Sequence, residues 1–231
     1  MSIYNIKQFA IWRLRNILHF LNFDYFTRLL RREGGVIGGS IHIQLITSDF
    51  KSSDIDIFVY ARRFSPVQQY LYSQCTHAQI VTTAYRHCTS EAVYQDMKFT
   101  NGDSMSEMYR MHHSFKVLSV WNYWFIFNKK ETILQLVSIE DLPNTKFTPM
   151  NKRIKNAIAD FSFTQSSYDG QRYNIYGIQD IWNKRLVCTS LFRVRASMLH
   201  DRATERHKTR ISKYEARGFT LSNPIYYQGR K

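Results

Sequence analysis

The chain has 231 residues, 15% of them aromatic, and a formal net charge of +14 at pH 7. This length is sufficient for one sizeable core, or for a core with a smaller helical appendage, and the positive charge favours polyanionic partners, with RNA or DNA ahead of an anionic membrane surface. No uninterrupted apolar stretch reaches the ~18 residues that a membrane-spanning helix requires, so we predict no membrane partner.

The first 35 residues predict two helices that pack on the core. Apolar residues from Ile6 to Leu21 recur at helical spacing, which predicts an amphipathic helix over residues 3–23, with membrane association as the alternative. Asp24 is expected to cap a second helix that runs through Leu30 and ends at the glycine pair that follows.

A turn at Gly38, Gly39 and Ser40 comes next, and the apolar residues 41–46 after it favour a helix. Glycine allows close approach of the backbone, and a helix N-terminus presents unpaired N–H groups to an anion. The turn is therefore a candidate phosphate-binding site.

An alternating run at residues 54–59 predicts a β-strand. Its period of two places Asp54 and Asp56 on one face, with Ile55, Ile57 and Val59 on the other. Two carboxylates on one strand face repel each other unless a cation lies between them, and paired oxygen ligands suit Mg²⁺. Phosphate site and metal ligands therefore fall within one short stretch of chain.

The glycine-serine turn, the thirteen residues 41–53 and the aspartate pair together resemble the signature of the DNA polymerase β-like nucleotidyltransferase superfamily. The sequence of this motif is most similar to that of the compact members found in large DNA viruses and fungi. Further segments that resemble these members occur up to residue 219. The resemblance implies transfer of a nucleotide from an NTP, with ATP expected, to an acceptor hydroxyl. It also implies two Mg²⁺ ions, or Mn²⁺ in their place, held by Asp54 and Asp56, and a triphosphate held by Gly39 and Ser40.

The middle of the chain predicts further elements of a sheet. Pro66 is expected to open a helix through Tyr72, and residues 80–84 are expected to form a short strand. Residues 114–127 and 132–139 are rich in aromatic and β-branched side chains and are separated by a polar turn. They predict a hairpin that adjoins the aspartate strand.

Three cysteines, Cys75, Cys88 and Cys188, are an odd number without a dense framework, which predicts a reducing, intracellular compartment. We expect the cytoplasm, or the host cytoplasm if the protein is viral. Cys75, His77, His87 and Cys88 invite a zinc interpretation, but their spacing fits no usual zinc finger, so we favour side chains without a metal. The histidine pair at positions 112 and 113 is interpreted in the same way.

The superfamily resemblance requires a third carboxylate from a neighbouring strand. Residues 151–158 have helical character, and residues 159–163 predict a short alternating strand that directs Phe161 and Phe163 into the core. In the similar viral and fungal proteins such a strand ends near a Tyr-Asp-Gly, so the resemblance assigns the third metal ligand to Asp160. Asp169 is the rival, although an Asp-Gly pair commonly forms a turn.

The last third of the chain is basic, and residues 201–216 suit a helix that stops at the glycine at position 218. Basic residues recur there every three or four positions and form one stripe: Arg206, Arg210, Lys213 and Arg217. Such a run can be a solvated face. Because residues 210–219 again resemble the compact relatives, we expect Arg210 and Lys213 to neutralise the triphosphate, and Arg206 and Arg217 to bind nucleic acid.

The predicted fold is α/β (α+β), with a mixed twisted sheet of the nucleotidyltransferase type, flanking helices and a basic C-terminal helix. The predicted organisation is N-terminal helices (1–35), a catalytic core (36–175), a basic helical segment (176–222) and a tail (223–231). The predicted function is metal-dependent transfer of an NMP to an RNA 3′ end, as in a template-independent, poly(A) polymerase-like terminal transferase. The alternatives are nucleotidylation of a protein side chain and a non-catalytic nucleic-acid-binding module of the same fold.

Overall fold

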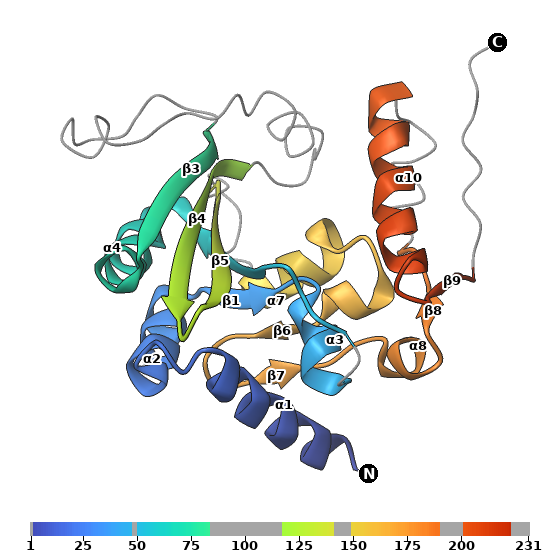
Figure 1. Ribbon diagram of the computed structural model, residues 1–231, viewed down its shortest axis with the longest axis horizontal. Coiled ribbons are helices and arrows are strands. Elements are labelled where there is room, and N and C mark those ends of the chain that lie inside the picture. The colour runs from blue at the N-terminus through green and yellow to red at the C-terminus, as the bar shows by residue number, and fades with distance from the viewer. Residues whose placement is uncertain (1, 48–49, 84–116, 141–148, 190–200, 223–231) are drawn as a thin grey trace.

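The computed structural model describes residues 2–47, 50–83, 117–140, 149–189 and 201–222. It confirms a mixed fold in which helices surround a seven-stranded sheet (Figure 1). Within these ranges no helix is both long enough and apolar enough to cross a bilayer.

The helices differ in length, and the longest lie at the two ends of the chain. The α-helices are α1 Ile3–Ile17, α2 Phe23–Glu33, α3 Ile41–Ile46, α4 Phe64–Gln74, α7 Met150–Arg153, α8 Ile178–Trp182 and α10 Asp201–Glu215. Three short segments have other helical geometries, namely η1 Ala61–Arg63 (3-10), η2 Ile154–Ile158 (π) and η3 Ser162–Gln165 (3-10). The helix expected at residues 151–158 is therefore present as α7 continued by one π turn.

The strands of the large sheet lie in the order β3-β4-β5-β2-β1-β6-β7, and β8 pairs separately with β9. Their bounds are β1 Val36–Gly38, β2 Ile55–Tyr60, β3 His77–Thr83, β4 Val117–Phe127, β5 Lys130–Ile139, β6 Ser167–Tyr168, β7 Tyr173–Asn174, β8 Arg185–Leu186 and β9 Thr220–Leu221. The predicted hairpin is confirmed, because β4 and β5 pair in antiparallel register and β5 runs parallel to β2. Its turn is tighter than predicted, since Asn128 and Lys129 alone connect the strands, both at positive φ.

The first two helices are confirmed, but their boundary differs from the prediction. α1 ends at Ile17, and Asn22 caps α2 by accepting a 3.1 Å hydrogen bond from the Tyr25 N–H. Asp24, the predicted cap, lies inside the first turn and pairs with Arg15 at 2.6 Å. A carboxylate there still favours the positive end of the helix dipole, so the residue type suited two neighbouring positions.

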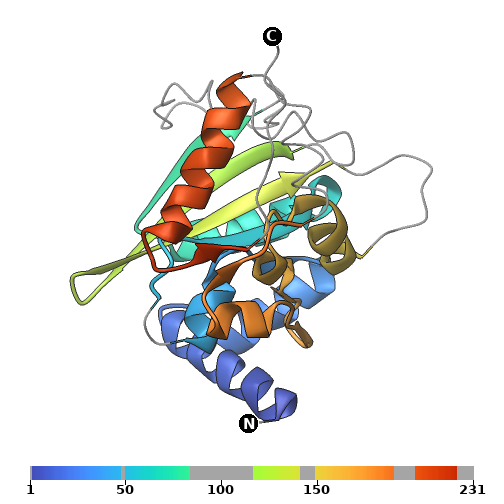
Figure 2. The same ribbon diagram turned by 90° about the vertical axis from the view of Figure 1, so that its right-hand side faces the viewer.

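The two faces of β2 have different environments, as its alternation predicts. Ile55, Ile57 and Val59 are buried in the main core, together with apolar residues of α1, α2 and α4. Asp56 and Phe58 project from the opposite face. Figure 2 shows α1, α2 and α3 on one side of the sheet and α10 on the other.

Helix α10 is anchored by its apolar residues. Ile211 and Tyr214 are buried in a cluster with Phe161 and Phe163, and Phe219 closes the cluster after the helix ends. This packing fixes the basic helix against the segment that contains Asp160.

The predicted strand at residues 159–163 is wrong. Phe161 makes only an isolated bridge to Cys188, and η3 begins at the next residue. The Thr164 hydroxyl lies 3.1 Å from the Phe161 N–H and accepts from it, while Ser162 donates to Asp180 at 2.7 Å. These side-chain bonds favour a turn over a strand. Phe161 is nevertheless buried, as the alternation predicted.

Candidate active site at the start of strand β2

The Gly39 turn and Asp56 are packed directly against each other. Gly38 pairs with Asp56 across β1 and β2, and Gly39 follows with φ +77°. A Cβ added at Gly39 would lie 2.0 Å from Oδ2 of Asp56. Gly39 is therefore required both by its backbone conformation and by the carboxylate that lies against it.

Asp54 and Asp56 are electrostatically coupled. Asp54 immediately precedes β2, and its Oδ1 accepts a 3.0 Å hydrogen bond from the Ser53 hydroxyl. Burial, reinforced by the negative charge of Asp54, raises the pKa of Asp56 to about 7, while Arg210 and Lys213 act in the opposite direction. A bound cation would lower this raised pKa again and so favour the charged form of the carboxyl group.

Ser40 binds a neighbouring side chain in this structure. Its hydroxyl is buried and lies 2.7 Å from the hydroxyl of Ser52, which donates to the backbone oxygen of Asp54 at 2.9 Å. The Ser52 N–H in turn donates to Gln44 of α3 at 2.8 Å. Ser40 thus connects the glycine turn to the Asp54 segment through hydrogen bonds. No pattern in the sequence indicated this role.

The basic stripe of α10 lies beside these carboxylates. Arg210 donates to the carboxylate of Asp160, and both Arg210 and Lys213 act on the charge of Asp56. Tyr214 lies within the influence of the same charges, and burial raises its pKa to about 12. The structure therefore brings Arg210 and Lys213 to Asp56, which lies more than 150 positions earlier in the sequence.

The structure describes the side chain at one end of the basic stripe, Arg217, but not the side chain at the other end, Arg206. The guanidinium of Arg217 stacks over the ring of Phe50 at 4.6 Å, and Arg217 lines one pocket together with Asp54 and Ile55 at the start of β2. The backbone of Arg206 belongs to α10, and its side chain lies outside the described part of the structure.

Asp160 is near the cluster but has a different partner from the one predicted. Its carboxylate is buried and pairs with Arg210, and its backbone oxygen accepts from the Thr189 N–H at 2.9 Å. Among the residues that the structure describes, no three carboxyl, imidazole or thiol groups gather as a metal centre. The third-ligand role of Asp160 stays a prediction, and in this conformation its charge is matched by a guanidinium.

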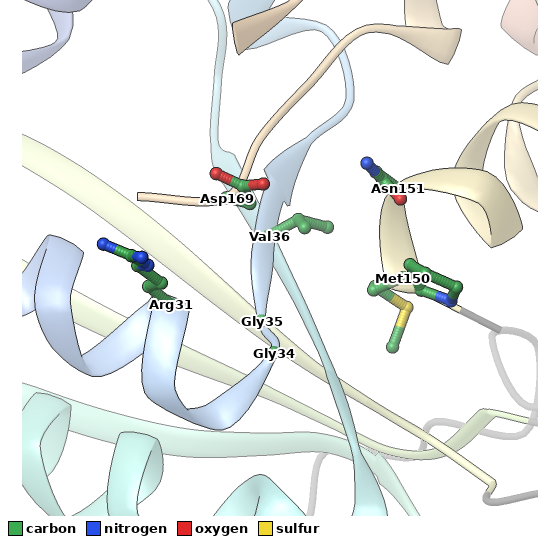
Figure 3. Close-up of a pocket in the computed structure, with 8 residues that line it drawn as sticks. Arg31, Gly34, Gly35, Val36, Met150, Asn151 and Asp169 are labelled. Carbon is green, nitrogen blue, oxygen red and sulfur yellow. The ribbon is translucent and has the colours of Figure 1, made fainter. Parts of the chain in front are cut away.

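Asp169 lies in a separate place. Its Oδ1 accepts hydrogen bonds from the backbone N–H groups of Gln171 and Arg172, at 2.9 and 2.6 Å, as in an Asx turn. Figure 3 shows it beside Val36, where it lines a small pocket of about 120 Å³. Asp169 does not appear among the charges that act on Asp56.

A buried histidine links the glycine turn to the rest of the sheet. The Nε2 of His42 lies 3.3 Å from the carbonyl oxygen of Ile37, and its Nδ1 lies 2.7 Å from the hydroxyl of Tyr173. Because a carbonyl can only accept, Nε2 carries the proton and Nδ1 accepts from the tyrosine. Burial lowers the pKa of His42 to about 3. His42 is thus a neutral structural residue of α3.

The zinc interpretation can be followed only in part. Cys75 and His77 are described, and the thiol of Cys75 donates to the Tyr72 carbonyl at 3.4 Å. His87, Cys88, the histidine pair at 112 and 113, and the tail at 223–231 lie outside the described residues.

Comparison with known proteins adds no relative: no family model matches the chain, and no curated protein matches it. The interpretation of the site therefore rests on its own geometry.

Proposed function

We propose that the protein is a metal-dependent nucleotidyltransferase of the DNA polymerase β-like type, which moves an NMP from an NTP to an acceptor hydroxyl. One observation carries the proposal. The glycine turn, the Asp54 and Asp56 pair and two cations of α10 converge, although they come from distant parts of the chain.

The fit of a metal ion is supported by the coupled carboxylates. Asp54 and Asp56 supply oxygen ligands of the kind that Mg²⁺ or Mn²⁺ prefers, and their mutual repulsion is the charge that a cation would offset. Asp54 and Asp56 would hold two such ions, with Asp160 as a further ligand. When bound, the ions would polarise the acceptor oxygen and neutralise the departing pyrophosphate.

The residues of α10 supply fixed positive charge for the triphosphate. A triphosphate beside Gly39 would lie among the groups that act on Asp56, which include Lys213 and Arg210. It would also offer Arg210 a second anionic partner in competition with Asp160. Release from Arg210 would leave the Asp160 carboxylate free to join the cluster.

The proposed reaction is a displacement at phosphorus. The acceptor oxygen forms a bond to the α-phosphorus of the NTP, the bond between that phosphorus and the bridging oxygen breaks, and pyrophosphate leaves. The hydroxyl proton passes to a carboxylate of the cluster. The net charge of +14 supports RNA as the acceptor, with its 3′ hydroxyl as the nucleophile.

The test is incubation with each labelled NTP and Mg²⁺, with either RNA or whole-cell protein as acceptor. Label in RNA supports the terminal transferase, and label in protein instead supports side-chain nucleotidylation. RNA binding without transfer of label to either acceptor would support a non-catalytic nucleic-acid-binding module of this fold.

A further inference from the structure

A second pocket is lined in part by Asp54. Its volume is about 280 Å³, and it is formed where the start of β2, the start of β5 and the ends of α1 and α3 meet. Its lining includes two cationic residues, two carboxylates and several hydroxyl groups: Lys51, Arg217, Asp54, Glu131, Ser52, Ser53 and Thr132. Asp54 is thus shared between this pocket and the candidate active site.

Arg217 points to a ligand that carries an anion. One face of its guanidinium is stacked on Phe50, and its Nη1 is buried without a hydrogen-bond acceptor in the part of the chain that the structure describes. Buried donors are nearly always paired, and a guanidinium binds phosphate oxygens in a fork geometry. Lys51 lines the same pocket and adds a second positive charge.

The remaining lining favours an organic phosphate over a bare anion. Glu131 and Asp54 would repel a second negative group, but their carboxylates accept hydrogen bonds from hydroxyl groups. Ile17, Ile41 and Ile133 supply apolar surface in the same pocket. A ligand with a phosphate at one end and a hydroxyl-bearing sugar at the other matches this lining.

We propose that this pocket binds the terminal nucleotide of the acceptor strand, with its phosphate on Arg217 and Lys51 and its sugar hydroxyl toward Asp54. The inference rests on the proposed function and adds to it the subsite that holds the end of the acceptor strand. An amino-acid side chain of a protein acceptor has no phosphate to occupy the cationic end. The pocket therefore favours a nucleic-acid acceptor over a protein one.

The first experiment measures binding of AMP by calorimetry, in the presence of Mg²⁺ and a saturating non-hydrolysable NTP analogue. Adenosine is the matched ligand without the phosphate. We expect AMP to bind more tightly than adenosine by about tenfold or more, and this advantage to be lost in Arg217→Gln and Lys51→Ala. Lys152→Ala removes the same charge from an exposed position on α7 and should behave as the wild type.

The second experiment measures transfer to an RNA oligonucleotide. Lys51→Ala and Arg217→Gln should raise the KM for RNA by about tenfold, with the KM for NTP changed far less. Because Lys51 is exposed, Lys51→Ala should fold like the wild type, and it tests the inference even if Arg217→Gln fails to fold.

The outcomes separate the inference from the proposed function. Wild-type transfer together with unchanged AMP binding and an unchanged KM for RNA in both variants would overturn the pocket assignment alone. Loss of AMP binding in both variants without any wild-type transfer would support the pocket as a nucleotide site and overturn the proposed function. Equal binding of AMP and adenosine to the wild type would overturn the phosphate site directly.

Discussion

Two glycine turns of this molecule each lie close to an aspartate, and they use the aspartate differently. Gly39 and Gly170 both have positive φ, and a Cβ would overlap Oδ2 of Asp56 at the first and the Thr27 carbonyl oxygen at the second, at 2.0 and 2.1 Å. Asp169 accepts two backbone N–H groups in its own turn, whereas Asp56 is coupled to charges from elsewhere in the chain. A motif of aspartate and glycine is therefore a candidate for chemistry where the carboxylate is coupled to charges from other segments, and not where it accepts the backbone N–H groups of its own turn.

The largest expected difference between the two regions is catalytic. Asp56→Ala and Asp54→Ala should each lower transfer by about a thousandfold or more, because each removes a charged ligand of the proposed metal site. Asp169→Asn should stay within about threefold of the wild type, because asparagine can accept the same backbone hydrogen bonds. Labelled-NTP transfer by all variants, at matched folded fraction, makes the comparison, and similar losses at positions 56 and 169 would contradict it.

The third carboxylate sharpens the same comparison. Asp160→Asn should lower transfer by about a hundredfold or more, because Asp160 is buried beside Arg210 next to the cluster. Asp169→Asn is again the control. A larger loss in Asp169→Asn than in Asp160→Asn would transfer the third-ligand role to Asp169.

The two glycines should both affect stability, but only one should affect activity. Gly39→Ala and Gly170→Ala each place a side chain at positive φ and into an occupied position, which should cost about 1–3 kcal/mol in the free energy of unfolding. Per folded molecule, Gly39→Ala should also lose most of its transfer activity, since Asp56 must move. Urea unfolding combined with rates corrected for folded fraction would detect the contrast, and normal activity in folded Gly39→Ala protein would contradict it.

The pH dependence of stabilisation by Mg²⁺ should report on Asp56. Its pKa is raised from 3.8 to about 7 in the folded protein, so stability falls as the pH rises from 3.8 to 7, and above pH 7 the folded protein holds an ionised, buried Asp56. Mg²⁺ should therefore raise the Tm by a few degrees more at pH 8 than at pH 6. Asp56→Asn should lose this pH-dependent increment while Asp169→Asn keeps it.

The smallest effect concerns the bond between His42 and Tyr173, which joins the two turns. His42 has its pKa lowered from 6.5 to about 3, so its stabilising contribution is complete above pH 6.5 and is lost as the pH falls toward 3. Asp56 has the opposite effect on stability, because protonation of its carboxyl group stabilises the folded protein as the pH falls from 7 to 3.8. The two contributions to the unfolding free energy therefore nearly cancel in the wild type. In Asp56→Asn, unfolding free energy should fall by about 1 kcal/mol per pH unit below 6.5, measured by urea titration. A wild-type slope as steep as that of the variant would exclude this balance.

The sequence was sufficient to predict features whose cause is local. The alternation of residues 54–59 correctly predicted β2 and the orientation of its side chains. The polar turn after Phe127 correctly predicted the hairpin of β4 and β5. The strand expected around Asp160 was wrong, because buried Phe161 and Phe163 are equally compatible with a bridge followed by a 3-10 turn. Local side-chain bonds of Thr164 decided between the two.

Long-range pairing was beyond pattern reasoning. The basic stripe of α10 was recognisable because its residues recur every three or four positions. The part of the molecule that the stripe faces, however, depends on how Ile211 and Tyr214 pack against distant residues. For that reason the pairing of Arg210 with Asp160 was not predicted. Ser52 and His42 carried no signal at all, because their roles depend on Ser40 and Tyr173 in the folded chain.

The central claim is that the site joins the α-phosphate of an NTP to an acceptor, and the most direct test uses the same NTP labelled at either the α- or the γ-phosphate. With Mg²⁺ and RNA, the α-label should enter the acceptor and the γ-label should appear only in pyrophosphate, with both signals lost in Asp54→Ala and Asp56→Ala. Transfer of the γ-label to the acceptor, or α-label transfer that survives both substitutions, would contradict nucleotidyl transfer at this site.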